Sequence, residues 1–342
     1  MGTAQAVNYS YTGLAATCPF QDTQFCDPPD FVAGDPSNWG DHRNWSPQGV
    51  PGANDTATIG SFAVNINGTR SVQRLTLNNG TLQSGTLNIT GPSASFTSSW
   101  IAGTISCTLN VASGALFRIS GSASRSFVAG VINNSGTVTW VDNGAIFCNS
   151  APVFNNKSGG IFNAQNNSQW FFSSGTAQPV FNNQAGATLN KSGADTTTTF
   201  GQVAFNNSGT VNALSGILEL GGGGNSPGTF TAANGARVNI SGTLTGTLNP
   251  AAGGIIGIQQ TSNGLGGGNT LLGGGLDCIG AGVSKIYSGT VIFNGIVTTG
   301  QAGGPGTLEI ENGTITGTAA SNLLSAGTGF YDWTGGTIGA DG

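Results

Sequence analysis

Glu309 and Glu311 are the residues of this sequence whose type and spacing best fit acid–base chemistry. Glycoside hydrolysis usually requires two carboxylates about 5 to 9 Å apart. The two glutamates lie two positions apart in the segment TLEIENG, so an extended strand would point both side chains to the same face. Other acids of the repeat region are dispersed along the chain, among them Asp142, Asp195, Glu219 and Asp277.

The basic residues of the repeat region are dispersed as well. A polysaccharide lyase needs Arg or Lys beside clustered acids, because a cation stabilises the enolate-like intermediate. The cations of the middle repeats are far apart in the sequence: Lys157, Lys191, Arg237 and Lys285. We therefore predict no catalytic residues, no cofactor and no enzymatic activity. The alternative is a polysaccharide lyase or glycosidase, or a carbohydrate-binding module.

Oxygen ligands that suit calcium occur in one loop, at Asp35, Asn38 and Asp41. Asx turns in a proline-rich loop use the same residue types, and we favour that interpretation. The chain has a single histidine, His42, and no group of cysteine and histidine at the spacing of a metal site. We predict no metal site.

The five cysteines fall into two groups. Cys18 and Cys26 lie eight positions apart in the loop CPFQDTQFC, where a disulfide bridge would staple the turn, and the sequence leaves this pairing open. The other three occur in strand-like segments and are expected to be small buried hydrophobic residues: Cys107, Cys148 and Cys278.

Four aromatic residues of the repeat region offer faces on which sugar rings stack: Trp100, Trp140, Trp170 and Phe171. The intervals between the three tryptophans are unequal and fit no single repeat column. Packing inside the fold explains these rings at least as well as a binding platform does.

The chain carries little charge. Of its 342 residues only 7% are charged and 59 are glycine, and the net charge is −5. The nine Lys and Arg residues form no basic stripe, so we expect no nucleic-acid partner. No run of about eighteen apolar residues predicts a transmembrane segment, and the first residues lack the pattern of a signal peptide.

A repeated motif organises the chain, in which one apolar residue is followed by two asparagines at regular intervals. The apolar residues form a predicted core column: Ile132, Phe154, Phe181 and Phe205. The first asparagines form a predicted ladder: Asn133, Asn155, Asn182 and Asn206. Stacked amides can bond one another along such a column.

Within one repeat, three short segments alternate apolar and polar residues, at 203–205, 211–213 and 218–220. Gly and Asn between them suit sharp corners. We predict an all-β fold, a right-handed parallel β-helix (β-solenoid) with about three short strands per coil of about 22–27 residues. Identical charges stacked in successive coils would repel, which explains why charged residues are scarce. A β-propeller or β-sandwich would instead show two-residue hairpin turns between longer strands.

The first sixty residues differ from the rest and hold six of the twelve prolines. We predict an N-terminal capping region with a Trp/Pro-rich loop at 1–60, in which Trp39 and Trp45 form the cap, and β-solenoid repeats at 61–342. No polar capping element follows the last strand, so we expect the repeats to be open to continuation after Gly342.

The stretch from Asn38 to Gly60, NWGDHRNWSPQGVPGANDTATIG, contains two tryptophans, an Asn-Trp-Ser triplet, a Val-Pro-Gly turn and an Asp-Thr strand. It resembles the opening of autotransporter-like, adhesin-type secreted bacterial surface proteins with β-helix repeats. The Phe-Asn-Asn repeats and the segment FYDWTGGTI at 330–338 are similar to strands of the same family. The resemblance implies export, display at the cell surface and an adhesive, matrix or scaffolding role.

These observations predict a non-enzymatic, extracellular structural or adhesive β-solenoid protein, located on the cell surface or in an extracellular fibre or matrix. Open parallel edges can pair with further strands, so the expected partners include other copies of the chain joined end to end in fibres. Surface glycans are the second expected partner.

Overall fold

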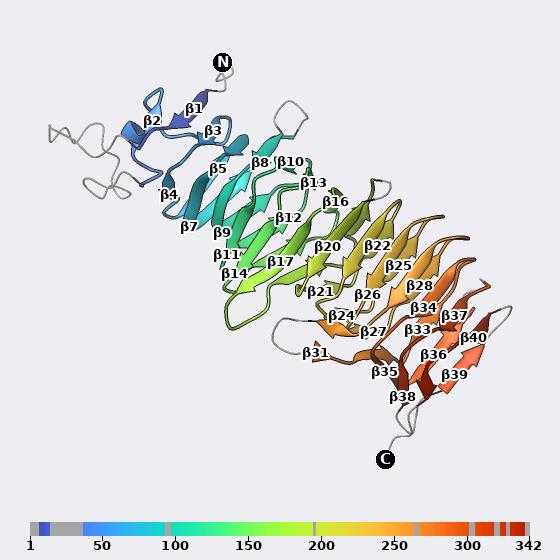
Figure 1. Cartoon of the computed structure of the whole chain (residues 1–342). Helices are drawn as coiled ribbons and strands as arrows, with labels where there is room; N and C mark the ends of the chain where they lie inside the picture. Colours follow the sequence, from blue (N-terminus) through green and yellow to red (C-terminus); the bar gives the residue numbers. More distant parts are fainter. Residues whose placement is uncertain are drawn as a thin grey trace. The chain divides into compact units, whose positions relative to one another are not determined.

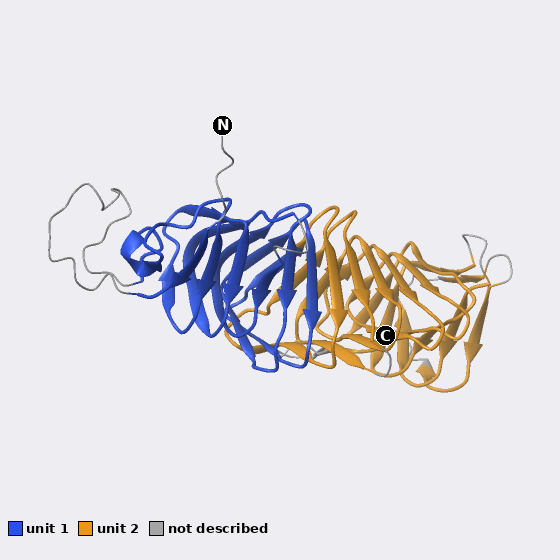
Figure 2. Ribbon diagram, turned by 90° about the horizontal axis from the view of Figure 1, so that it is seen from above, with its two compact units in different colours: residues 1–155 blue, residues 156–342 orange. Residues whose placement is uncertain are grey.

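The computed structural model describes residues 7–13, 37–92, 97–193, 196–262, 267–300, 305–317, 322–325 and 329–338 (Figure 1). The predicted parallel β-solenoid is confirmed, since parallel sheets stack in about 12 turns with almost no helix. The chain divides into two compact units, unit 1 at 1–155 and unit 2 at 156–342 (Figure 2). The predicted division at residue 60 remains a prediction.

In unit 1, one sheet, sheet A, receives one strand from each turn. The first two strands are antiparallel and the others are parallel. Its strands, in spatial order, are β2 (Trp45–Ser46), β1 (Asn8–Tyr11), β3 (Thr56–Ile59), β6 (Arg74–Leu77), β8 (Ser98–Trp100), β10 (Leu116–Ile119) and β13 (Thr137–Val141). A short 3-10 helix, η2 (His42–Asn44), precedes β2.

The other sheet of unit 1, sheet B, receives two consecutive segments from each turn. In two turns these segments join in one long strand, and the long strands pair over their whole length with a register shift between Gln83 and Thr86. The strands are β4 (Ala63–Asn65), β5 (Thr69–Val72), β7 (Gly80–Ile89), β9 (Gly103–Val111), β11 (Arg125–Val128), β12 (Val131–Asn134), β14 (Ile146–Asn149) and β15 (Val153–Asn156).

Unit 2 also has strands of the sheet A and sheet B types. Its sheet A strands are β16 (Ile161–Gln165), β19 (Thr188–Lys191), β22 (Thr210–Ala213), β25 (Thr229–Ala232), β28 (Thr247–Pro250), β33 (Leu276–Cys278), β36 (Ile296–Thr299) and β39 (Asn322–Ser325). Its sheet B strands are β17 (Gln169–Ser174), β18 (Val180–Asn183), β20 (Thr197–Gly201), β21 (Ala204–Asn207), β23 (Ile217–Leu220), β26 (Arg237–Ile240), β29 (Ile255–Ile258), β34 (Val283–Ile286), β37 (Thr307–Ile310) and β40 (Phe330–Trp333).

A third sheet, sheet C, forms in the later turns of unit 2. Its strands are β24 (Asn225–Ser226), β27 (Thr243–Leu244), β32 (Thr270–Gly273), β35 (Thr290–Asn294), β38 (Thr314–Gly317) and β41 (Thr337–Ile338). A small antiparallel pair, β30 (Thr261–Ser262) and β31 (Gly267–Gly268), lies between two of these turns in the sequence.

The core consists of the inward residues of each strand, which alternate with outward ones. The four residues of the predicted core column are buried: Ile132, Phe154, Phe181 and Phe205. Backbone register places Phe181 opposite Phe205, and the pair Leu189 and Val211 repeats this relationship on sheet A. Residues one period apart therefore pack on one another inside the solenoid.

The turns vary in length more than the sequence repeat predicts. Phe230 lies opposite Leu248 of the next turn, and Leu248 in turn lies opposite Cys278, so the second of these turns is much longer than the first. The long turn contains the β30–β31 pair. The strands thus keep their register while the connections between them absorb the differences in length.

Glycine is required where corners of successive turns approach closely. Gly80 and Gly103 occupy the same corner in neighbouring turns, because the register pairs them. A Cβ on Gly103, whose φ is +94°, would lie 2.1 Å from the carbonyl oxygen of Gly80. Any side chain would therefore break this contact between turns.

Candidate functional site

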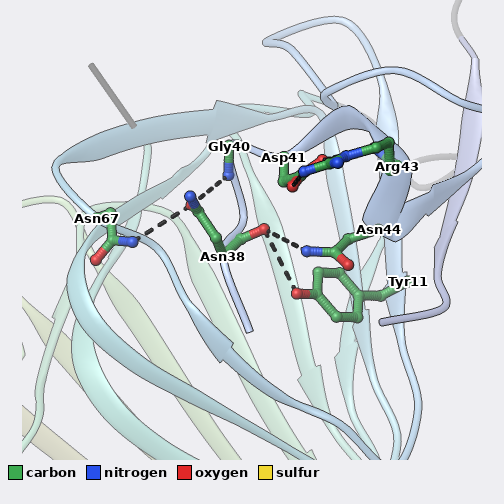
Figure 3. Close-up of polar contacts among 7 residues, drawn as sticks. All are labelled: Tyr11, Asn38, Gly40, Asp41, Arg43, Asn44 and Asn67. Atoms are coloured by element: carbon green, nitrogen blue, oxygen red, sulfur yellow. Dashed lines mark hydrogen bonds and ion pairs between the residues drawn. The ribbon is translucent and has the colours of Figure 1, made fainter. Parts of the chain in front are cut away.

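Asn38 organises the polar contacts of the predicted cap (Figure 3). Its buried side-chain oxygen accepts hydrogen bonds from the backbone N–H of Gly40 at 2.9 Å and from Nδ2 of Asn67 at 3.3 Å. Its backbone oxygen accepts from Nδ2 of Asn44 at 2.9 Å and from the Tyr11 hydroxyl at 3.5 Å. One residue thus ties β1, the helix η2 and the first turn together.

The two tryptophans of the predicted cap pack against each other. Trp39 and Trp45 are buried, and their ring centroids lie 4.7 Å apart with an interplanar angle of 66°. Nε1 of Trp45 donates to the backbone oxygen of Trp39 at 2.9 Å. The ring of Tyr11 meets Trp45 edge-on at 4.9 Å. The aromatic cluster therefore covers the beginning of the core in unit 1.

The oxygens considered for calcium serve other partners. Oδ1 of Asp41 accepts from the backbone N–H of Arg43 at 3.0 Å and from its Nε at 2.8 Å, and the Asp41 carboxylate also pairs with Nη2 of Arg43. Burial raises the pKa of Asp41, but the hydrogen bonds from Arg43 outweigh it and the net pKa is lowered. Asp35 lies outside the described residues. Among the described residues, no three His, Cys, Asp or Glu side chains gather at one point.

The longest asparagine ladder of the described residues lies in unit 1, and it includes two of the predicted members, Asn133 and Asn155. Nδ2 of Asn110 donates to Oδ1 of Asn88 at 2.8 Å, Nδ2 of Asn133 to Asn110 at 2.8 Å, and Nδ2 of Asn155 to Asn133 at 2.9 Å. Nδ2 of Asn88 ends the series on the Ser71 hydroxyl at 3.2 Å. The amides therefore all point the same way along the stack.

In unit 2, Nδ2 of Asn206 donates to Oδ1 of Asn182 at 2.9 Å. A separate ladder on sheet A joins Asn163, Asn190 and Asn212, with each amide 3.0 Å from the preceding one. Sequence reasoning did not include this second ladder. The sequence feature that could have predicted it is the Asn at the same outward position of the segments TLNK and TVNA.

The second asparagine of each Phe-Asn-Asn motif points inward. Asn156, Asn183 and Asn207 are fully buried. Nδ2 of Asn156 donates to Oδ1 of Asn183 and to the backbone oxygen of Thr188, both at 2.9 Å. Nδ2 of Asn183 likewise donates to Oδ1 of Asn207 at 2.9 Å. This inner ladder satisfies corner carbonyls that burial would otherwise leave unpaired.

The two candidate acids are joined by a lysine. Nζ of Lys285 lies 3.1 Å from Oε1 of Glu309 and 2.8 Å from Oε2 of Glu311. Hydrogen bonding to Glu311 is the main reason why the pKa of Lys285 is raised, with Glu309 contributing in the same direction. The register of β34 and β37 places Lys285 directly opposite Glu309, a proximity that sequence distance conceals.

A second cation joins this cluster through an aromatic ring. The guanidinium carbon of Arg237 lies 4.1 Å from the centroid of the Tyr287 ring, and Nζ of Lys285 lies 5.3 Å from it. Nε of Arg237 donates to Oδ1 of Asn239 at 2.6 Å, and Nδ2 of Asn239 donates to Glu219 at 2.5 Å. The sequence spacing predicted isolated cations, whereas the fold brings Arg237 and Lys285 to one ring.

Arg125 is a buried cation in unit 1. Its Nε donates to the backbone oxygen of Trp100 at 3.0 Å, Nη1 to Gly144 at 2.9 Å, and Nη2 to Gly121 at 3.0 Å and to Ser120. Burial lowers its pKa to about 10, so the group stays cationic at neutral pH. The side chain connects the corners of three successive turns.

Lys191 is the buried cation of unit 2, at an inward position where both register partners are alanine, Ala164 and Ala213. Its Nζ donates to the Thr196 hydroxyl at 2.6 Å and to the backbone oxygens of Ser192 at 2.8 Å and Asn166 at 3.3 Å. Burial lowers the pKa of Lys191 to about 8.

The tryptophans considered as a sugar platform belong to the core, because Trp100, Trp140 and Trp170 are fully buried. The ring of Trp170 stacks on Phe200 at 5.6 Å. The three cysteines of the strands are buried and form no disulfide, and burial raises the pKa values of Cys107 and Cys278 to about 12. Cys18 and Cys26 lie outside the described residues.

Comparison with known proteins finds no matching family model, no similar curated protein and no similar solved structure. The resemblance to autotransporter-like surface proteins therefore rests on the sequence motifs alone. Within the described residues, no helix has the length and hydropathy needed to cross a membrane.

Proposed function

We propose that this chain is a non-enzymatic, extracellular structural or adhesive β-solenoid, displayed on the cell surface or in an extracellular fibre or matrix. The observation that carries the proposal is the ladder of Asn88, Asn110, Asn133 and Asn155, whose amides bond from turn to turn on the outside of the fold. Such a ladder stabilises the stack while presenting one uncharged chemistry repeatedly to the surroundings.

Adhesion suits this arrangement because equal weak contacts, repeated along a rigid surface, add up to firm attachment. The resemblance of residues 38–60 to secreted surface proteins supports an extracellular location. Buried cation contacts at Arg125 and Lys191 tie neighbouring corners together and add rigidity to such a surface.

Two measurements test this proposal. Antibodies against the purified chain should label the surface of intact source cells or their extracellular matrix, and beads coated with the chain should attach to those surfaces. Exclusive labelling of the cell interior, together with no attachment of the beads, would contradict the proposal.

Self-association into fibres is part of the same proposal. Light scattering and electron microscopy across a wide concentration range should show elongated assemblies that grow with concentration. Particles that remain monomeric at every concentration would remove the fibre role and leave the adhesive one.

A polysaccharide-active enzyme is the second candidate, because Lys285, Glu309 and Glu311 converge beside Tyr287. Lyases use a cation beside clustered acids, and glycosidases use a pair of carboxylates. The test is a screen of anionic and neutral polysaccharides for new reducing ends or unsaturated products. Turnover that is lost in Glu309→Gln and Glu311→Gln, and retained in Asp277→Asn, would replace the first proposal. Absence of products from every polymer would leave it in place.

A further inference from the structure

The outward side of β7 and β9 in unit 1 carries two matching rows of hydroxyl and amide side chains. The register pairs Thr81 with Thr104 and Asn88 with Asn110. We call the eight outward residues the hydroxyl–amide face: Thr81, Gln83, Thr86, Asn88, Thr104, Ser106, Thr108 and Asn110. All eight are partly exposed, whereas the residues between them, apart from the exposed Ser84 and Gly85 at the register shift, are buried.

The hydroxyl–amide face contains no charge. β7 and β9 have no acidic or basic residue. Of the cations on the two flanking strands, Arg125 is buried and Arg70 of β5 lies opposite the inward Leu87, outside the outward rows. Sheet A of the same unit differs, because it carries Arg74 and Arg118 on its outward side. Charged ligands therefore find no counter-ion on the hydroxyl–amide face, and large aromatic or Arg side chains that anchor protein interfaces are missing from it as well.

The amides of the hydroxyl–amide face keep hydrogen-bonding capacity. A primary amide has two N–H donors and two acceptor lone pairs. In the ladder Asn110 uses one N–H toward Asn88 and one lone pair toward Asn133. One donor and one acceptor of Asn110 remain for groups outside the ladder, and the same holds for Asn88, which donates to Ser71. These groups repeat at the spacing of the turns, about 4.8 Å.

We propose that the hydroxyl–amide face binds neutral polysaccharide chains. A neutral polymer of sugars offers uncharged donors and acceptors that recur along its length, which matches a charge-free surface with regularly spaced amides and hydroxyls. Each contact is weak, so binding depends on many sugar units engaging many turns. The inference rests on the proposed adhesive function and names its ligand class.

The test uses the whole chain in co-sedimentation with insoluble cellulose, chitin and β-1,3-glucan, and with immobilised alginate as the anionic comparison. We expect binding to at least one neutral polymer, no binding to alginate, and a change of no more than about twofold when salt is raised, because screening acts only on charges. Thr108→Arg should weaken binding at least about tenfold by placing a hydrated charge in the array.

Thr58→Arg is the matched control, since Thr58 is a partly exposed, outward residue of sheet A in the same unit. It should bind like the wild type. Gln83→Glu adds a charge with little change of shape and should weaken binding even if Thr108→Arg fails to fold. Equal binding by all variants, binding to alginate alone, or strong salt dependence would overturn the inference.

Two outcomes separate this inference from the proposed function. Attachment to cell surfaces without binding to any neutral polymer would refute the polysaccharide and leave the adhesive role. Binding to ice crystals, seen as thermal hysteresis that Thr108→Arg removes, would assign the hydroxyl–amide face to ice and also overturn the inference.

Discussion

Phe181 stacks on Phe205 of the next turn, with ring centroids 5.2 Å apart and ring planes inclined by only 13°. The two rings are buried, and the backbone register places them opposite each other. Like residues of successive turns therefore lie on one another. The same relationship lets asparagines form ladders and disfavours charged residues, which would repel one another when stacked.

Removing one of these two rings should open a cavity that the neighbouring turns cannot fill. We expect Phe205→Ala to lower the free energy of unfolding by about 3 to 5 kcal/mol, measured by denaturant titration. Leu214→Ala is the control, because Leu214 is 54% exposed and its loss should cost little. Equal effects of the two substitutions would show that the rings are not packed as described.

The ladder can be tested at its middle member. Asn110→Asp keeps the shape but replaces the N–H that binds Asn88 with a charged oxygen, so two acceptors face each other. We expect a loss of about 1 to 3 kcal/mol in the free energy of unfolding at neutral pH. Asn78→Asp alters an exposed corner residue and should change stability by less than about 0.5 kcal/mol. A neutral effect of Asn110→Asp would argue against the ladder.

Arg125 is expected to stabilise the folded chain through hydrogen bonds to four backbone carbonyl oxygens. Arg125→Met removes the donors and leaves the carbonyl oxygens of Trp100 and Gly144 without this partner. We expect the free energy of unfolding, measured by denaturant titration, to fall by about 1 to 3 kcal/mol, because buried carbonyl oxygens lose their hydrogen bonds. Arg118→Met, at an exposed position of β10, serves as the comparison and should be nearly neutral. If Arg125→Met folds with wild-type stability, the corner contacts do not hold the turns together.

Lys191 gives a pH dependence of stability. Its pKa is lowered to about 8 in the folded chain from 10.5, so between these two values the unfolded chain binds more protons. Stability contributed by this residue therefore rises as the pH increases from about 8 to 10.5. The difference in unfolding free energy between wild type and Lys191→Met should grow in favour of the wild type over that window. A constant difference would mean that the oxygens around Nζ offset the cost of burying the charge.

The strand cysteines should be unreactive in the folded protein. Burial keeps the pKa values of Cys107 and Cys278 near 12, so neither forms a thiolate at pH 8, and Cys148 is buried too. Iodoacetamide should leave all three unmodified in the native state. In denaturant without reductant, mass spectrometry should find three labelled cysteines if Cys18 and Cys26 are bridged, and five if they are not. Rapid native labelling of Cys107 would contradict its burial.

The motif Phe-Asn-Asn was sufficient to predict the fold class, and the apolar residues of its column are buried. In parallel in-register stacking, residues one period apart meet, so a repeated motif directly reports a spatial column. For the same reason, the first asparagines of successive motifs were predicted to lie in one column. The inward direction of the second asparagines was not predicted, because the direction of a residue at a corner depends on how the chain bends there.

The position of Lys285 beside Glu309 and Glu311 was beyond sequence reasoning for a different reason. Turn lengths differ widely in this part of the chain, since the turn from Phe230 to Leu248 is much shorter than the turn from Leu248 to Cys278. Where the motif is absent and the turns differ in length, a fixed period no longer predicts which residues of successive turns lie opposite each other. The cations therefore look isolated in the sequence although two of them share one tyrosine ring.

The sequence by itself determined that the chain winds in short parallel strands with glycine and asparagine at the corners, because alternation and corner chemistry are local properties. Tertiary structure alone decided which charged side chains meet across the turns and which asparagines point inward. The register between turns is set by packing of the whole core, and connections of unequal length shift it in ways that no local pattern records.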